Sequence, residues 1–158
     1  MNLKKLTQKI NEASSLAELV CEGLLPEPND DGSYFFFYYS RSDFKSALKD
    51  IVTLSELGLS IWYDRKQENG ASWHSDMLQR ASNFHCASIV FYLSENAVRS
   101  DFFWQLCALV VERHLVYCSV NLPDEDGNAF SIHKIAKSYS FTPEHMDLAT
   151  QLFGEEIT

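Results

Sequence analysis

Charged side chains follow two apolar segments of this chain, at the point where each segment ends. Arg41 and Asp43 come shortly after the run YFFFYY, and Asp64 ends the run LSIWYD. If these ends meet in the fold, the charged groups line a ligand cleft, and neighbouring aromatic side chains could stack on a base or fill the core. The residues that we predict for this cleft are Tyr39, Arg41, Asp43, Asp64, Trp73 and Ser94.

Each of these charged residues also has a purely structural interpretation. Asp43 could cap the helix that follows it. Asp64 and Arg65 could form an exposed ion pair, which contributes less than about 1 kcal/mol. Taken singly, these residues therefore indicate no chemistry sharper than a polar cleft.

Several sequence motifs of known chemistry do not occur. The chain has neither GxGxxG after its first apolar run nor GxxxxGK[ST], so a glycine-rich phosphate loop is not expected. It also lacks the GxSxG turn of α/β-hydrolases. Cys107, His114 and Cys118 lack the paired spacing of zinc ligands, so we predict no metal site.

The elements that would position the cleft alternate along the chain. Four apolar runs without alternation, typical of strands buried on both faces, are expected at 34–39, 59–64, 86–94 and 115–122. Helical spacing follows the first three, as in Phe44, Ala47, Leu48 and Ile51, and Thr142 with Pro143 begins a last helix that ends at Gly154. This pattern predicts a parallel sheet covered on both faces, with function at the carboxyl ends of its strands.

The first 32 residues carry a different pattern. Leu3, Leu6 and Ile10 have helical spacing, and Ser15 with Glu18 has the spacing of a capping box. We therefore predict a helical N-terminal extension and linker at 1–32 and one main domain at 33–158.

Composition limits the kinds of binding partner and the cellular compartment that we expect for this protein. The chain has 158 residues and a net charge of −9, which argues against nucleic acid and anionic membranes as partners. Its four cysteines form no CxxC pair, so reduced thiols are expected. With no apolar signal segment and no run of about 18 apolar residues, we predict a cytoplasmic protein.

Four segments in order resemble the TIR (Toll/interleukin-1 receptor) domain of bacterial type. FFYYSRSD resembles its first strand and turn, with Tyr38 in place of the usual serine, and ASIVFYLSENAVRSDF resembles its third strand and the following serine, Ser100. LGLSIWYDRKQENGASW resembles its second conserved segment through Gly58, Ile61, Trp62, Asp64, Gly70 and Trp73. The resemblance covers about 34–122 and implies a flavodoxin-like three-layer α/β/α fold with a five-stranded parallel sheet.

TIR domains either assemble with one another or cleave the nicotinamide–ribose bond of NAD+. In the enzymes a glutamate lies six residues after the serine, where a carboxylate can offset the positive charge of the transition state. The corresponding residue here is Leu106. We therefore expect no catalytic residue at that position, with Asp101 and Glu95 as the candidates for a displaced acid.

The resemblance thus implies an assembly module that associates with itself or with another TIR protein. The expected contact surface is Arg65, Lys66, Gly70 and Trp73. No cofactor is expected, although NAD+ could be bound as a ligand or substrate. The first alternative is an active NAD+ glycohydrolase or cyclase, and the second is a related enzyme that acts on an N-glycosidic bond, such as a nucleoside deoxyribosyltransferase.

Overall fold

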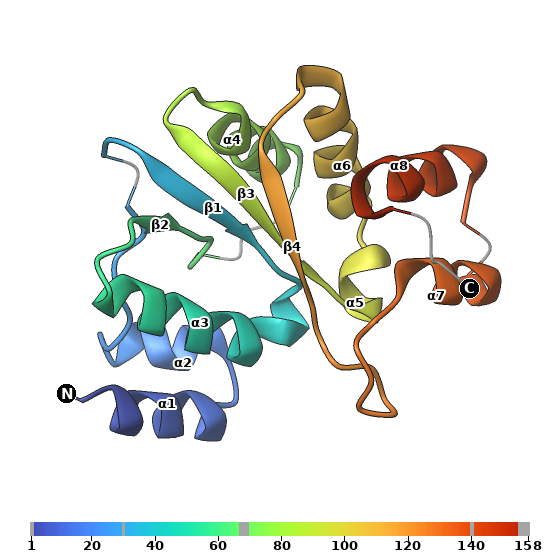
Figure 1. Cartoon of the computed structure of the whole chain (residues 1–158). Coiled ribbons are helices and arrows are strands. Elements are labelled where there is room, and N and C mark those ends of the chain that lie inside the picture. Colours follow the sequence, from blue (N-terminus) through green and yellow to red (C-terminus); the bar gives the residue numbers. More distant parts are fainter. Residues whose placement is uncertain (1, 30, 67–69, 140, 155–158) are drawn as a thin grey trace.

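A parallel sheet forms the centre of the molecule. The computed structural model describes residues 2–29, 31–66, 70–139 and 141–154 (Figure 1). Its four strands are β1 (Tyr34–Tyr38), β2 (Ile61–Trp62), β3 (Cys86–Leu93) and β4 (Tyr117–Asn121), in the order β2-β1-β3-β4. All neighbouring pairs are parallel. The expected β-α alternation is therefore confirmed.

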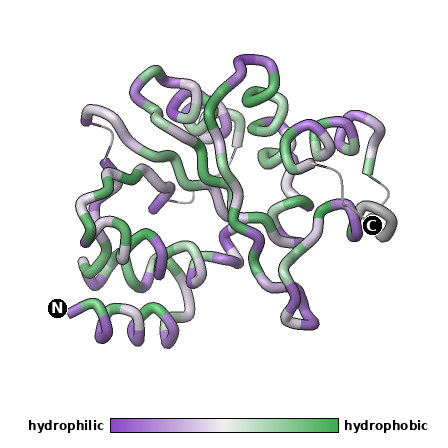
Figure 2. The backbone as a smooth tube through the Cα atoms, in the orientation of Figure 1, coloured by the Kyte–Doolittle hydropathy of each residue, from purple (hydrophilic) through white to green (hydrophobic). Residues whose placement is uncertain are grey.

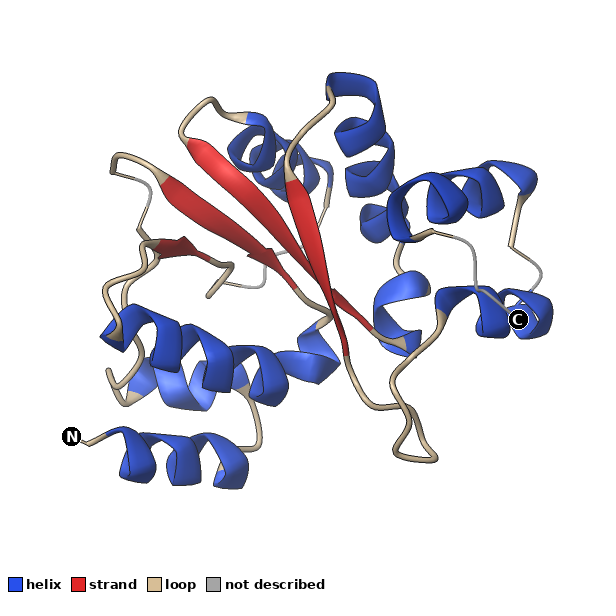
Figure 3. Ribbon diagram, viewed as in Figure 1, coloured by secondary structure: helices blue, strands red, loops and turns tan. Residues whose placement is uncertain are grey.

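Helices cover both faces of this sheet (Figures 1 and 3). On one face lie α1 (Leu3–Glu12), α2 (Leu16–Cys21) and α3 (Phe44–Glu56), and on the other lie α4 (Ala71–Ser82), α6 (Asp101–Arg113) and α8 (Pro143–Phe153). Alternate residues of β1 enter the two cores, since Phe36 belongs to the α4–α6–α8 side and Phe37 to the α1–α2–α3 side. The architecture is mixed α/β and compatible with a flavodoxin-like fold.

The fifth strand implied by the resemblance is absent from the described part of the chain. After β4 the chain forms α7 (Ile132–Tyr139). Ser131 Oγ accepts a hydrogen bond from the backbone nitrogen of Lys134 at 3.4 Å, and Ile132 is buried. A capped turn with one apolar face favours a helix over a strand at this point. The prediction of five strands is therefore wrong for these residues.

Polarity along the backbone follows the layers. Hydrophobic residues lie along the central strands, whereas the outer turns of α1 and the loop after β4 are hydrophilic (Figure 2). Short helical segments follow two of the strands, η1 (Arg41–Asp43) after β1 and α5 (Glu95–Val98) after β3. Both lie at the carboxyl ends of central strands, and so they position the residues that follow those strands.

Two helix caps predicted from the sequence are confirmed. Ser15 Oγ accepts from the backbone nitrogen of Glu18 at 3.3 Å, and Thr142 Oγ1 accepts from that of His145 at 3.1 Å. Ser100 occupies the N-cap position of α6, but its side chain makes no capping hydrogen bond. Its hydroxyl instead pairs with Tyr38, whose ring comes from β1. This serine therefore connects α6 to the strand end.

The N-terminal segment packs against the same core as the sheet. Ile10, Leu16 and Leu19 are buried in the cluster that α3 and the sheet also line. The linker then runs beside β2, where the backbone nitrogen of Asn29 donates to the carbonyl oxygen of Ile61 at 2.9 Å. This contact covers part of the outer edge of the shortest strand.

Candidate functional site

The residues predicted for one cleft divide between two cavities at the carboxyl ends of the strands. The first, the front cavity, has a volume of about 280 Å³ and lies between the end of β1 and the amino ends of α4 and α6. Its walls include four predicted residues, which are Tyr39, Arg41, Asp64 and Trp73. Parallel strand ends thus bring these side chains together as expected.

Asp43 and Ser94 line a second, larger cavity instead. This acidic cavity has a volume of about 780 Å³ and lies near the ends of β3 and β4. Ser94 Oγ donates to Asp43 Oδ2 and accepts from the backbone nitrogen of Ala97 at 3.1 Å. The two residues therefore hold η1 and the start of α5 together, and they lie apart from the front cavity.

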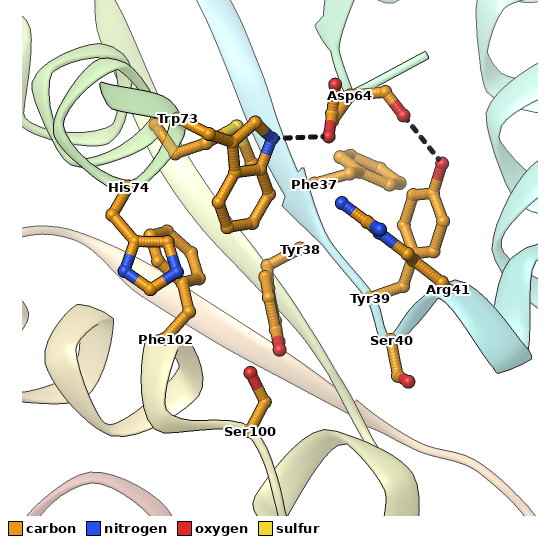
Figure 4. Close-up of a pocket in the computed structure, with 11 residues that line it drawn as sticks. Phe37, Tyr38, Tyr39, Ser40, Arg41, Asp64, Trp73, His74, Ser100 and Phe102 are labelled. Carbon is orange, nitrogen blue, oxygen red and sulfur yellow. Dashed lines mark hydrogen bonds between the residues drawn. The ribbon is translucent and has the colours of Figure 1, made fainter. Parts of the chain in front are cut away.

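Aromatic rings form one wall of the front cavity (Figure 4). The ring centroid of Phe102 lies 5.0 Å from that of Trp73, 5.3 Å from that of His74 and 5.6 Å from that of Tyr38. All three pairs are tilted, a common geometry for aromatic contacts. Such a wall can contact a planar ring of a ligand.

Sequence reasoning missed His74, Phe102 and Ser100 as site residues. His74 directly follows the predicted Trp73, and Phe102 lies two residues after the N-cap of α6. Their place in the sequence could have identified them, because each lies in the first turn of a helix that begins at the carboxyl end of the sheet. A search limited to charged residues after strands does not find them.

Charged groups form the opposite side of the front cavity. Asp64 Oδ2 accepts a hydrogen bond from Trp73 Nε1 at 2.8 Å, and Asp64 Oδ1 accepts from the backbone nitrogen of Lys66 at 3.1 Å. The Arg41 guanidinium carbon lies 5.7 Å from the Trp73 ring centroid, within the range of a cation–π contact. The Tyr39 hydroxyl donates to the backbone oxygen of Asp64 at 3.4 Å. One carboxylate and one guanidinium thus flank a single indole.

The tyrosines of this cavity are neutral at physiological pH. Burial raises the pKa of Tyr38 to about 12, although its hydrogen bond with Ser100 lowers it. Figure 4 shows the two hydroxyls directed toward each other. Burial also raises the pKa of Tyr39, with smaller contributions from Tyr63 and Asp64 in the same direction. Both side chains therefore serve as phenol groups and not as bases.

The position that the resemblance assigns to a catalytic glutamate lies in the apolar core. Leu106 is 0% exposed and belongs to the same buried cluster as Phe103 and Val110. Asp101 is exposed in the first turn of α6. Glu95 lines the acidic cavity and pairs with Arg99 at 3.0 Å. None of these carboxylates lines the front cavity.

Two residues of the predicted contact surface are exposed, and the other two contact other parts of the protein. Lys66 and Gly70 are exposed, and Gly70 precedes α4 with a φ of 98°, a conformation that favours glycine. The Arg65 side chain is 14% exposed and pairs with Glu27 at 2.8 Å, whereas Trp73 is turned into the front cavity. Residues 67–69 of this loop lie outside the described residues.

Two further properties follow from the described part of the chain. Among its residues, no group of three or more histidine, cysteine, aspartate or glutamate side chains could hold a metal ion. None of its helices combines the length and the apolar character that crossing a membrane requires.

Comparison with known proteins identifies no relative of this chain. The chain matches no protein-family model, no curated protein and no solved structure. Function is therefore inferred from the residues of the two strand-end cavities.

Proposed function

We propose that this chain is a TIR-type assembly module that associates with itself or with another TIR protein. In this proposal its nucleotide-sized cleft is the front cavity, and the cleft lacks the usual catalytic glutamate. The observation that carries the proposal is the burial of Leu106 within the core beneath α6. A side chain at this depth contributes to packing and offers no charge to a bound ribose.

The chemistry of NAD+ cleavage explains why the absence of a carboxylate at position 106 matters. The bond between nicotinamide and ribose breaks through an oxocarbenium-like state, which a nearby carboxylate stabilises. Loss of one such electrostatic group commonly reduces a rate by about 10²–10³. We therefore expect nicotinamide release to be slow or absent, and assembly to be the retained activity.

Self-association tests the proposal directly. Lys66 is exposed beside the loop that the resemblance assigns to TIR contacts. Lys66→Glu should lower the apparent mass of the protein in sedimentation velocity across a concentration series, because it reverses one charge in the contact. Lys4→Glu is the matched control, since Lys4 is exposed on α1. Equal sedimentation of wild type and both variants at every concentration would contradict this contact surface.

A second candidate function is NAD+ hydrolysis with a displaced acid. One observation favours it, because Asp64 brings a carboxylate into the front cavity beside aromatic rings. Asp101 and Glu95 lie outside this cavity, so Asp64 is the better candidate. Nicotinamide release by the wild type that is lost in Asp64→Asn would support the enzyme. Release that survives in Asp64→Asn would mean that another residue supplies the acid, and no release from either protein would leave assembly as the better proposal.

A further inference from the structure

The two edges of the central sheet differ in how they are covered. The outer edge of β2 is partly covered by the linker, because the backbone nitrogen of Asn29 donates to the carbonyl oxygen of Ile61 at 2.9 Å. The strand β4 lies at the other edge, and among the described residues it pairs only with β3 (Figure 1). A flavodoxin-like sheet has the strand order 2-1-3-4-5, so a fifth strand would lie beside β4. The described part of the chain therefore leaves this edge of the sheet open.

Every second residue of β4 directs its backbone groups away from the sheet. The carbonyl oxygen of Val116 accepts from the backbone nitrogen of Ile89 at 3.0 Å. The backbone nitrogen of Leu122 donates to the carbonyl oxygen of Leu93 at 3.0 Å, so the even-numbered residues of this segment face β3. The outward groups belong to the odd-numbered residues, which are Tyr117, Ser119 and Asn121. No backbone hydrogen bond from another described residue reaches these groups, so a further strand could pair with them.

The edge of β4 carries none of the features by which proteins prevent strand pairing. Segment 115–122 reads LVYCSVNL, without a charged residue or a proline, in a chain of which 22% is charged. The five residues of β4 keep an unbroken register with β3. Cys118 and Ser119 are exposed, and Val116 is 67% exposed. Because charged side chains, prolines and bulges normally protect an exposed edge, this edge favours pairing with a further strand.

The charges beside the two ends of β4 favour a second copy of the chain in the antiparallel direction. The charged residues that follow β4 are all acidic, namely Asp124, Glu125 and Asp126. Before β4, the acidic Glu112 is followed by the basic and exposed Arg113, so that end has no net charge. Antiparallel pairing of two copies places each acidic end beside the Arg113 end of the other copy, whereas parallel pairing would bring the two acidic ends together. A second copy therefore fits this edge in one direction.

We propose that the outer edge of β4 is a self-association surface, on which the β4 strand of a second copy pairs in the antiparallel direction and continues the sheet. Centring the pairing on Ser119, the middle residue of the strand, matches all five residues of both copies. The two Ser119 residues then form one hydrogen-bonded pair, and Tyr117 of each copy pairs with Asn121 of the other, for a total of about six backbone hydrogen bonds. This two-fold contact closes on itself. It is separate from the Lys66 loop and adds a second contact to the proposed assembly.

Sedimentation velocity of the whole chain over a concentration series tests the edge. Ser119→Pro removes an outward N–H and should weaken dimerisation at least about tenfold, because it deletes two of the shared hydrogen bonds. The variant should keep its fold, since a strand tolerates proline where the N–H faces away from the sheet. Ser119→Ala is the matched control, because it keeps the N–H, and it should sediment as the wild type does.

A second variant at the same position does not alter the backbone. Ser119→Lys places two ammonium groups opposite each other at the two-fold axis, and like charges at this place should prevent dimerisation. The Ser119 side chain is exposed, so the lysine can be accommodated in the single chain. Thermal melting of all three variants shows whether each retains the fold.

Cysteine crosslinking tests the antiparallel register. In this register Cys118 of one copy lies directly opposite Val120 of the other, at a Cα separation of about 4.5 Å that permits a disulfide. In a Cys21→Ser background, Val120→Cys should therefore form a covalent dimer with oxidised glutathione. Val116→Cys is the matched control, because Val116 is more exposed than Val120 but lies opposite Leu122 in this register, away from Cys118.

Three results would overturn the pairing of β4. They are a wild type that is monomeric at every concentration, sedimentation that neither Ser119→Pro nor Ser119→Lys changes, or crosslinking of Val120→Cys that does not exceed that of Val116→Cys. A loss of mass in Lys66→Glu alone would support the loop contact and reject the edge, and a loss in the Ser119 variants alone would do the reverse. A monomeric wild type would still leave the proposed function another TIR protein as partner. The two proposals can therefore fail separately.

Discussion

The variant Leu106→Glu tests directly whether position 106, where the resemblance implies a catalytic glutamate, is buried in the apolar core. Leu106 is 0% exposed and lies among apolar residues of the core below α6. A buried glutamate can have a pKa of about 8–9, compared with about 4.3 in an unfolded chain. A difference of about four pH units at 1.36 kcal/mol each corresponds to about 5 kcal/mol. We therefore expect the variant to lose about 3–5 kcal/mol of unfolding free energy at neutral pH.

The loss should depend on pH in a defined direction. The folded state would bind the glutamate proton more tightly than the unfolded state, so the penalty is absent below the unfolded pKa and grows as pH rises toward the folded pKa. Urea unfolding at about pH 5.5 and about pH 8 should therefore show the variant losing up to about 3 kcal/mol between the two conditions. Wild type measured under the same conditions gives the pH dependence of the other groups.

Leu106→Gln is the matched control for this experiment. Glutamine has nearly the same shape as glutamate and no charge, so it separates the cost of a buried polar group from the cost of ionisation. Its difference from wild type should be the same at both pH values. If Leu106→Glu is as stable as Leu106→Gln at about pH 8, position 106 reaches solvent, and the argument from its burial fails.

Substitutions at three further positions test local features of the fold by urea unfolding. Tyr63→Phe should cost about 1 kcal/mol, because it removes the partly buried hydrogen bond to the backbone oxygen of Pro26, and no loss would mean that this bond does not hold the linker. Ser15→Ala should also cost about 1 kcal/mol through the lost cap at Glu18, whereas Ser15→Asp, which keeps an acceptor, should cost less. Phe84→Ser should change stability by less than about 0.5 kcal/mol, because Phe84 is 88% exposed, and a larger loss would reveal a contact that its exposure hides.

The layers of the fold were predictable because their signals are local and repeated. Continuous apolar runs and helical spacing marked β1, β3, α3 and α4, and cap residues such as Thr142 marked helix starts. The second strand extends over only two residues, although the apolar run suggested six. Burial of Tyr63 and its bond to the linker explain why that run looked longer than the strand.

The cleft was predictable only in part because it depends on tertiary contacts. Arg41, Asp64 and Trp73 meet as expected from parallel strand ends. The sequence does not show that Asp43 would pair with Ser94, which draws both residues to another cavity. That pairing joins residues 51 positions apart, and no local pattern encodes it.

The linker beside β2 has a mechanical consequence. Contacts from Pro26, Glu27 and Asn29 tie the N-terminal segment to residues 61–65, the short stretch of chain that lines the front cavity through Asp64. A load applied at the amino end therefore reaches the central strands by two routes, through the packing of α1 and α2 against α3 and through the linker. Displacement of the linker would open the cavity between the linker, the end of β2 and α4, while β1 and β3 keep their pairing. In this molecule, tension on the N-terminal helices and the geometry of the cleft are coupled through the linker's hydrogen bonds and its ion pair as well as through the packing of α1 and α2.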